Sequence, residues 1–231
     1  MKNLIFKSFQ AFLLLSLFLG FQTQAQPKQS FKAQDIGKPA IKGDAQMVTN
    51  GVDIKAGGED IWNNADQFHF VYQQVTGDFD FAVRLEYLEK AHLYTKGGLM
   101  ARENLTAGAR NVMFVGFPSN EKRNNNLGGY EFQYRLEKNK ESKAIYPSLD
   151  DSVKQASFPI NYPNGWMRLK RVGTTFSAYT SPDGLAWVMY TEFVMEMPEK
   201  LFLGMAVTAH IKGVVTNAKI RDLQMKKPEK E

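Results

Sequence analysis

Apolar and polar positions alternate with a period of two through most of the chain. Residues 79–87 place an apolar or aromatic side chain at every second position up to Tyr87, with Arg84 and Glu86 between them. Residues 130–136 repeat the pattern, and their polar positions are Glu131, Gln133 and Arg135. Such alternation is typical of half-buried β-strands, and no helical period is sustained over three turns. Further strands are predicted at residues 68–72, 96–102, 111–117, 144–146, 166–172, 174–180, 186–190, 201–209 and 215–225.

Turn signals separate these segments. A Gly-Asp pair follows the aromatic strand at 68–72, an Asn- and Gly-rich loop spans 120–129, and Ser-Pro-Asp-Gly occupies 181–184. Residues 137–158 are polar and weakly patterned, and we interpret them as a long excursion. Ten or more short strands with such turns predict an all-β fold, a two-sheet antiparallel sandwich of the jelly-roll kind.

The first 25 residues do not belong to this pattern. Lys2 and Lys7 precede a short apolar run at 11–21, and Thr23 and Ala25 supply a small-residue cleavage site. This arrangement predicts a cleaved signal peptide at 1–25 and export of a single domain at 26–231, to the periplasm or the outside of the cell. The chain has no Cys, so we expect neither disulfides nor a lipoprotein anchor. No second apolar run predicts a membrane span in the mature chain.

Charge excludes one class of partner. Without Lys2 and Lys7 the chain carries 27 basic and 24 acidic residues, and these are scattered along it. Nucleic-acid binding would need a basic stripe or a recognisable module, and the sequence has neither. The oligomeric state has no sequence signal.

Several motifs, in order along the chain, carry a family resemblance. They are the Asp-Ile-Gly-x-Pro run at 35–39, the Gly-x-Asp-Ile-Trp run at 58–62, the aromatic run at 66–72, the Lys-x-Gly-Leu-Met-x-Arg-Glu run at 96–103, the Trp-x-Arg-Leu-x-Arg run at 166–171 and the Ser-x-Asp-Gly-x-x-Trp run at 181–187. Together they resemble the bacterial domain family often labelled "regulation of enolase protein". That resemblance implies an exported jelly roll of the concanavalin A-like lectin and glucanase superfamily, associated with carbohydrate and without an established reaction.

A polar sheet face is the predicted ligand-binding surface. In lectin-like jelly rolls one sheet commonly holds the sugar, whose hydroxyls pair with Arg and carboxylate groups and whose C–H face stacks on aromatic rings. Candidate stacking rings are Trp62, Tyr94 and Trp166. The full ligand-binding set is Trp62, Arg84, Lys96, Arg102, Glu131, Gln133, Arg135, Trp166 and Arg168. The alternative is a solvated face laced with cross-strand ion pairs, to which Glu86 and Lys170 would also belong.

Catalysis and metal binding have weaker signals. Glycoside hydrolysis needs two carboxyl groups facing each other across the scissile bond, and Glu86 with Glu131 is the candidate pair. The Glu-x-Asp-x-x-Glu strand signature of glucanases with this fold is absent. Asp53, Asp60, Asp66 and Asp222 are candidate ligands for Ca²⁺, against the alternative that each caps its own turn. No other cofactor is expected.

Three functions therefore fit the sequence. The first is an exported module that binds an oligo- or polysaccharide. The second is a divergent glycoside hydrolase or lyase, and the third is a protein-interaction sandwich without a small ligand. The position of Glu86, Glu131 and Arg102 in the fold distinguishes them.

Overall fold

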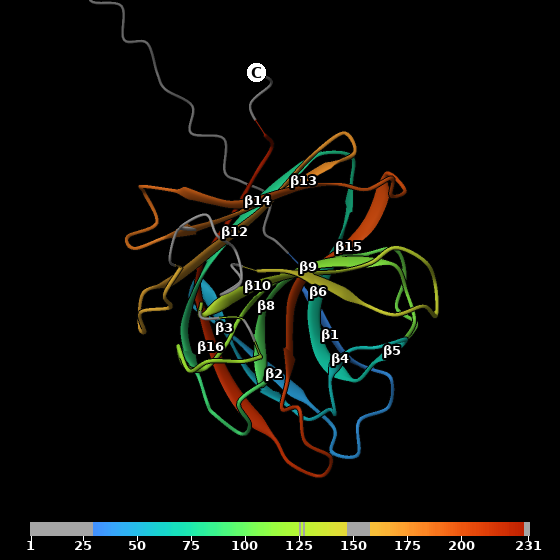
Figure 1. The fold of residues 1–231 in the computed structure, drawn as a ribbon, viewed down its shortest axis with the longest axis vertical. Helices are drawn as coiled ribbons and strands as arrows, with labels where there is room; N and C mark the ends of the chain where they lie inside the picture. Colours follow the sequence, from blue (N-terminus) through green and yellow to red (C-terminus); the bar gives the residue numbers. More distant parts are fainter. Residues whose placement is uncertain (1–29, 125, 127, 147–157, 229–231) are drawn as a thin grey trace, which may run out of the picture.

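Two seven-stranded antiparallel sheets face each other in the computed structural model of the chain, which describes residues 30–124, 126, 128–146 and 158–228 (Figure 1). We name them the front sheet, with strand order β1-β6-β15-β8-β9-β10-β11, and the back sheet, with order β14-β13-β12-β7-β16-β3-β2. The predicted all-β sandwich is thus confirmed. No helix in the described residues is long and apolar enough to cross a membrane.

The strand bounds follow the predicted segments closely downstream of residue 67. The front sheet consists of β1 (Lys32–Ile36), β6 (Phe68–Thr76), β15 (Lys200–Thr208), β8 (Lys96–Arg102), β9 (Asn111–Gly116), β10 (Tyr130–Arg135) and β11 (Lys143–Ile145). The back sheet consists of β14 (Val188–Val194), β13 (Thr175–Ser181), β12 (Gly165–Val172), β7 (Phe79–Leu88), β16 (Thr216–Lys226), β3 (Gly51–Ala56) and β2 (Asp44–Val48). A short hairpin, β4 (Ile61–Trp62) with β5 (Ala65–Asp66), forms a third, two-stranded sheet.

The strand prediction missed β1, β2 and β3. β2 is the edge strand of the back sheet, and none of its residues is fully buried, so its sequence shows no buried alternating face. The predicted signal peptide at 1–25 lies outside the described residues, as does most of the second half of the predicted excursion at 137–158.

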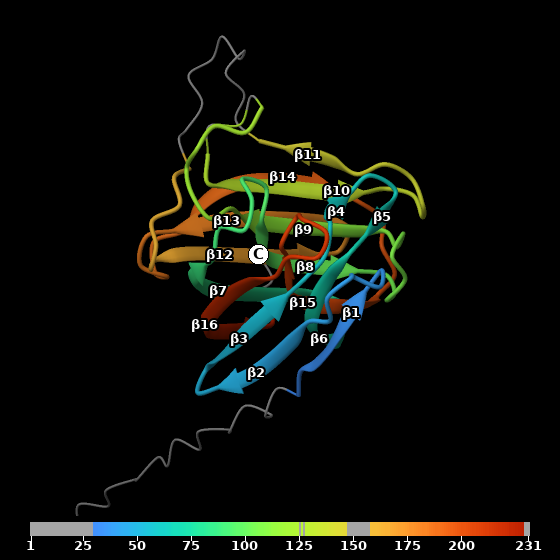
Figure 2. The ribbon, with the colours of Figure 1, turned by 90° about the horizontal axis from the view of Figure 1, so that it is seen from below.

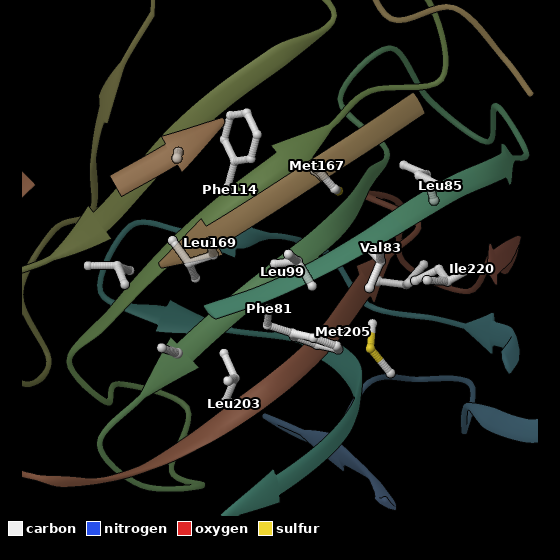
Figure 3. Close-up of a cluster of buried hydrophobic side chains, with 14 of the residues drawn as sticks. Phe81, Val83, Leu85, Leu99, Phe114, Met167, Leu169, Leu203, Met205 and Ile220 are labelled. Carbon is white, nitrogen blue, oxygen red and sulfur yellow. The ribbon is translucent and has the colours of Figure 1, made fainter. Parts of the chain in front are cut away.

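The main core fills the space between the two sheets. Figure 3 shows Phe81 of β7 and Leu169 of β12 in the cluster that also holds Leu99 and Phe114 of the front sheet. All four side chains are fully buried. Burial of a large apolar side chain contributes about 1.5–3 kcal/mol, so this layer supplies much of the stability. It also fixes the faces of the strands, because residues that alternate with these must point away from the core.

One predicted inward side chain points outward. Tyr87 is exposed although Leu85 and Leu88 of the same strand are buried. In the pairing with β16, Leu85 is opposite Ile220 and Tyr87 is opposite Lys219, so Glu86 has no partner. This β-bulge shifts the alternation by one residue, which a period of two does not anticipate.

A second apolar cluster covers part of the outer face of the front sheet. Phe68 and Phe70 of β6 and Met113 of β9 belong to it, and Ile61 of the β4–β5 hairpin packs among them. Figure 2 shows the front strands in sequence from β11 to β1, with β4 and β5 beside them. Burial of Ile61 therefore holds the hairpin against this face and places its next residue, Trp62, there.

Two turn glycines provide a test of local packing. Gly173 and Gly184 both have positive φ, +58° and +77°. A Cβ at Gly173 would meet no atom within 4 Å, whereas one at Gly184 would lie 2.8 Å from the Trp166 ring. We expect Gly173→Ala to destabilise the fold by about 1–2 kcal/mol through backbone strain alone, and Gly184→Ala by more. Urea denaturation of both variants measures the difference, and equal losses would contradict the Trp166 contact.

Candidate functional site

The structure divides the predicted ligand-binding set between two opposite faces of the sandwich. Lys96 and Arg102 lie on β8 and Glu131, Gln133 and Arg135 on β10, all in the front sheet. The members on β7 and β12 belong to the back sheet; they are Arg84, Trp166 and Arg168. The prediction that Arg84, Arg102, Glu131 and Arg135 share one polar sheet face is therefore wrong. Apart from the bulge at Tyr87, the alternation within these strands was predicted correctly, but sheet order is set by pairing between distant segments.

The back-sheet residues form surface ion pairs. Arg84 Nε donates to Asp222 Oδ2 at 2.6 Å, and Arg168 Nε donates to Asp80 Oδ1 at 2.6 Å. Trp166 packs edge-on against Trp187, with ring centroids 6.4 Å apart. These contacts match the alternative of a solvated face laced with ion pairs.

Arg102 and Arg135 occupy one end of the front sheet's outer face. Both are paired with Asn111 of β9 in the strand register, so the two arginines lie on either side of Asn111 in one row across the sheet. Asp66 of β5 lies between them: Arg135 Nη2 donates to Asp66 Oδ1 at 2.5 Å and Arg135 Nη1 to Asp66 Oδ2 at 2.9 Å. Arg102 Nη1 lies 3.5 Å from Asp66 Oδ2. All three side chains are fully buried, and that burial lowers the pKa of Arg102 to about 10.

This ion triad fixes the hairpin that carries Trp62. Arg135 Nη2 donates to the Trp62 carbonyl at 3.1 Å and to the Asn63 carbonyl at 3.2 Å. Asn63 adopts a positive φ of 45°, which Asn tolerates better than most residues. Arg102 and Arg135 therefore position the site and do not line it.

A pocket of about 680 Å³ lies next to this triad on the same face. Its lining comes from the β4–β5 hairpin, β8, β10, β11 and the connecting segments beside them. The lining residues are Asp60, Trp62, Tyr94, Lys96, Arg123, Asn124, Glu131, Gln133, Tyr134, Ser142, Lys143, Ala144, Tyr146 and His210. The structure thus brings together four members of the predicted set, namely Trp62, Lys96, Glu131 and Gln133.

One wall of the pocket is a chain of charged and aromatic groups. The buried Lys96 Nζ donates to Asp60 Oδ1 at 2.7 Å and to the Ile61 carbonyl at 2.9 Å, and lies 5.2 Å from the centroid of the Trp62 ring. His210 Nδ1 lies 3.2 Å from the same Asp60 oxygen. The His210 ring contacts the ring of Tyr94 at a centroid distance of 5.4 Å.

The floor of the pocket is formed by β10. Gln133 Nε2 donates to Glu131 Oε1 at 2.7 Å, and Asn126 Nδ2 donates to Glu131 Oε2 at 3.2 Å. Arg123 lies over the Phe117 ring, with its guanidinium carbon 4.0 Å from the centroid. Glu131, Gln133 and Arg123 are each buried. The floor therefore presents fixed polar groups, which is the arrangement that orients a small ligand.

The Asp60 carboxylate makes stability depend on pH. Burial raises its pKa, but the hydrogen bond from Lys96 and the nearby charges of Lys96 and His210 outweigh that effect and lower it from 3.8 to about 2. The lowered pKa of Asp60 stabilises the folded state by about 2 kcal/mol. This stabilisation is present above pH ~4 and is lost as pH falls towards 2. We expect Asp60→Asn to be less stable than the parent at pH 7 and to lose less stability between pH 4 and pH 2. Denaturation at several pH values measures this, and parallel pH profiles would contradict it.

The two candidate catalytic carboxyl groups do not meet. Glu86 points from the outer face of the back sheet, where Arg84 Nη1 donates to it at 3.1 Å, and Glu131 lies in the pocket of the front sheet. Asp60 is the other carboxyl group in the pocket, and with a pKa of about 2 it is deprotonated at neutral pH. Asp60 therefore lacks the raised pKa that a general acid needs.

The four candidate Ca²⁺ ligands do not fit a metal site. Asp60 is paired with Lys96, and Asp66 is paired with Arg135. Asp53 Oδ1 accepts a hydrogen bond from Arg221 at 2.5 Å, and Asp222 accepts one from Arg84. Each carboxylate thus has a cationic partner. Asp60 and Asp66 belong to the region of the β4–β5 hairpin, and Asp53 and Asp222 belong to the back sheet. Across the described residues, no group of three or more His, Asp or Glu side chains could hold a metal ion.

Sequence reasoning missed several pocket residues. Arg123 and Asn124 of the lining belong to the loop at 120–129, where no periodicity indicates which side chains turn inward. His210 has a positive φ of 65° in the connection between β15 and β16, and it meets His92 and Tyr94 of another connection only through tertiary packing. Lys143 precedes the predicted strand at 144–146 and Tyr146 ends it, and the pairing of this segment with β10 was not predicted from the sequence.

Comparisons with known proteins identify the fold. No protein-family model matches the chain, and no curated protein sequence matches it. The crystal structure of a functionally unknown protein from Saccharomyces cerevisiae is similar at a TM-score of 0.63 and 14% identity, covering 86% of this chain and 97% of that one. The exoplasmic/lumenal domain of VIP36, in its Ca²⁺/Man3GlcNAc-bound form, is similar at 0.51 and 8% identity, covering 87% and 85%. The sandwich is therefore a concanavalin A-like jelly roll.

Proposed function

We propose that the protein is an exported carbohydrate-binding module whose ligand occupies the pocket on the outer face of the front sheet. The observation that carries this proposal is the juxtaposition of a half-buried indole, Trp62, with the buried polar floor formed by Glu131 and Gln133. A saccharide has both an apolar C–H face and a ring of hydroxyls, so it needs both kinds of surface within one site.

The size and composition of the pocket support a small ligand. About 680 Å³ falls within the range of 300–1,000 Å³ usual for small-molecule sites. Tyr94 and Tyr146 add aromatic surface at the walls, and Lys96 and Glu131 add charged hydrogen-bonding groups. A protein-interaction sandwich would need no such buried polar floor.

Two lines of similarity point in the same direction. The VIP36 domain was solved with Man3GlcNAc bound, and it has the fold of this chain. The motifs at 35–39, 58–62 and 96–103 support kinship with the bacterial "regulation of enolase protein" domains, and the first 25 residues support export. Identity to the VIP36 domain is only 8%, so the likeness gives the fold, and the residues of the pocket must carry the function.

Binding without hydrolysis is the form of the function that the geometry favours. Glu86 and Glu131 lie on opposite faces of the sandwich, and Asp60 is held ionised by Lys96. The candidate Ca²⁺ ligands are paired with Arg or Lys, so we propose that binding does not depend on Ca²⁺. Addition of EDTA is expected to leave the affinity unchanged.

A glycan array tests the proposal, followed by titration of the best binder against two tyrosine variants. Residues 26–231 are used, since they contain every described residue. Tyr94→Ala removes a ring of the pocket, and we expect it to weaken binding roughly 5–10-fold. Tyr87→Ala is the matched control, because Tyr87 is exposed on the opposite face of the sandwich. Absence of any glycan binding by the folded protein, or equal loss in both variants, would refute the proposed site.

A further inference from the structure

The orientation of one amide in the pocket floor is fixed by its neighbour. Glu131, as a carboxylate, can only accept hydrogen bonds, so the group of Gln133 that faces it at 2.7 Å must be the NH₂. Asn126 is held in the same way: its Nδ2 donates to Glu131, and its Oδ1 accepts from the Gly128 amide at 2.8 Å. Neither amide can turn over without losing a hydrogen bond to Glu131.

Gln133 Oε1 consequently has no protein donor among the described residues, although Gln133 is only 3% exposed. A donor in the same pocket lining is also unsatisfied. Arg123 is 1% exposed; its terminal nitrogens donate to the Ser119 and Gly128 carbonyls, and its Nε has no acceptor in the described part of the chain. A buried polar atom without a partner costs about 1–3 kcal/mol, so both atoms favour a ligand that satisfies them.

The unsatisfied acceptor and donor distinguish between classes of sugar. A hydroxyl group both donates and accepts, so hydroxyls can satisfy Gln133 Oε1 and Arg123 Nε alike. A carboxylate or sulfate ester only accepts, so it would leave Gln133 Oε1 unpaired and would lie beside the Glu131 carboxylate. Lys143 is exposed at the rim, and Lys96 is already paired with Asp60. The third cation of the lining, Arg123, already interacts with the charge of Glu131.

This inference rests on the proposed function. We propose that the pocket binds a neutral saccharide, one hydroxyl of which donates a hydrogen bond to Gln133 Oε1. Glu131 is the positioning residue that makes the pocket select against uronate and sulfated sugars. Glu131 acts through Gln133 in this account: it determines which end of the amide faces the ligand. In Glu131→Gln the side chain at 131 can both donate and accept. The Gln133 amide is then free to turn over and present its NH₂ to an anionic group.

The test compares matched glycans on residues 26–231. Glycans ending in glucose, galactose, mannose or N-acetylglucosamine are arrayed beside counterparts that have a carboxylate or a sulfate ester at C6. We expect the parent protein to prefer the neutral members by roughly 10-fold or more, the effect of one unsatisfied buried group. Glu131→Gln should reduce this preference by a similar factor. Glu86→Gln, on the back sheet, is the matched control and should leave the preference unchanged.

Gln133→Met provides a second variant of similar volume. It removes the unsatisfied acceptor, and we expect it to fold and to bind the neutral glycans roughly 10-fold less tightly. Preference for the anionic glycans in the parent, an unchanged preference in Glu131→Gln, or parental affinity in Gln133→Met would each overturn this inference while leaving saccharide binding established. If the folded parent bound no glycan of either kind, both the inference and the proposed function would fail.

Discussion

Replacement of Asp66 by alanine is expected to destabilise the protein by about 3–5 kcal/mol, because it leaves two buried guanidinium groups without their anion. Arg102 and Arg135 are fully buried, and both contact this one carboxylate. Most of their remaining hydrogen bonds go to backbone carbonyls, for example from Arg102 Nε to Asn104 at 2.8 Å. The others go to the uncharged Met100 sulfur and Ser142 hydroxyl. Carbonyl dipoles do not neutralise two cations, so the variant has to unfold locally or to admit water.

The change should also affect the pocket. Asp66 belongs to the hairpin that carries Trp62, and Arg135 holds the Trp62 carbonyl through the same guanidinium group. We therefore expect Trp62 fluorescence to shift towards that of an exposed indole before global unfolding begins. The measurement is urea denaturation followed by circular dichroism and by tryptophan fluorescence.

Asp53→Ala is the control for Asp66→Ala. Asp53 also pairs with an arginine, Arg221, but its side chain is 42% exposed. A pair of this kind contributes about 0–1 kcal/mol. A loss in Asp66→Ala no larger than that in Asp53→Ala would mean that the triad does not hold the hairpin on the sheet.

The second large effect is expected in binding. Trp62→Ala should weaken saccharide binding by roughly 30-fold or more, the loss that follows truncation of a central aromatic contact. Trp62 has the largest aromatic ring system among the pocket residues, and it is half-buried on a two-residue strand, so its removal should cost little stability. Isothermal titration with the best glycan from the array measures the loss.

Trp187→Ala is the matched control for Trp62→Ala. Trp187 is a half-buried indole with a cation nearby, since Arg168 lies 5.6 Å from its ring centroid, but it belongs to the back-sheet surface. It should retain parental affinity. Retained binding in Trp62→Ala combined with a loss in Trp187→Ala would move the site to the other face of the sandwich.

The alternation of apolar and polar residues predicted the fold well, because the sequence of each strand reflects which of its two faces is buried. The alternation at 130–136 correctly placed Glu131, Gln133 and Arg135 on the face opposite Tyr130 and Phe132, and the structure confirms that division. It also predicted that these polar side chains would be available to a ligand. Arg135 instead forms an ion pair with Asp66, which lies 69 positions away in the sequence, so the pairing could not be predicted from the local pattern.

The pocket was predictable only in part, because it depends on strand order and on loops. Nothing in the alternation at 79–87 shows that β7 belongs to the back sheet and β10 to the front sheet, so Arg84 and Glu131 appeared to be neighbours. Arg123 reaches the pocket from an irregular loop, and its position depends on hydrogen bonds to the Ser119 and Gly128 carbonyls. Such contacts have no period in the sequence.

The most direct test of saccharide binding in this pocket uses the three tryptophans of the chain. Each contributes one indole N–H resonance to a ¹⁵N-correlated NMR spectrum, and Trp62 is the one that lies in the pocket. Residues 26–231 are titrated with pooled neutral mono- and disaccharides, with resonances assigned through Trp62→Phe, Trp166→Phe and Trp187→Phe. We predict that the Trp62 resonance shifts in a saturable manner while those of Trp166 and Trp187 stay in place. Saturable shifts of Trp166 and Trp187 with Trp62 unmoved, or no shift of any indole, would contradict the account.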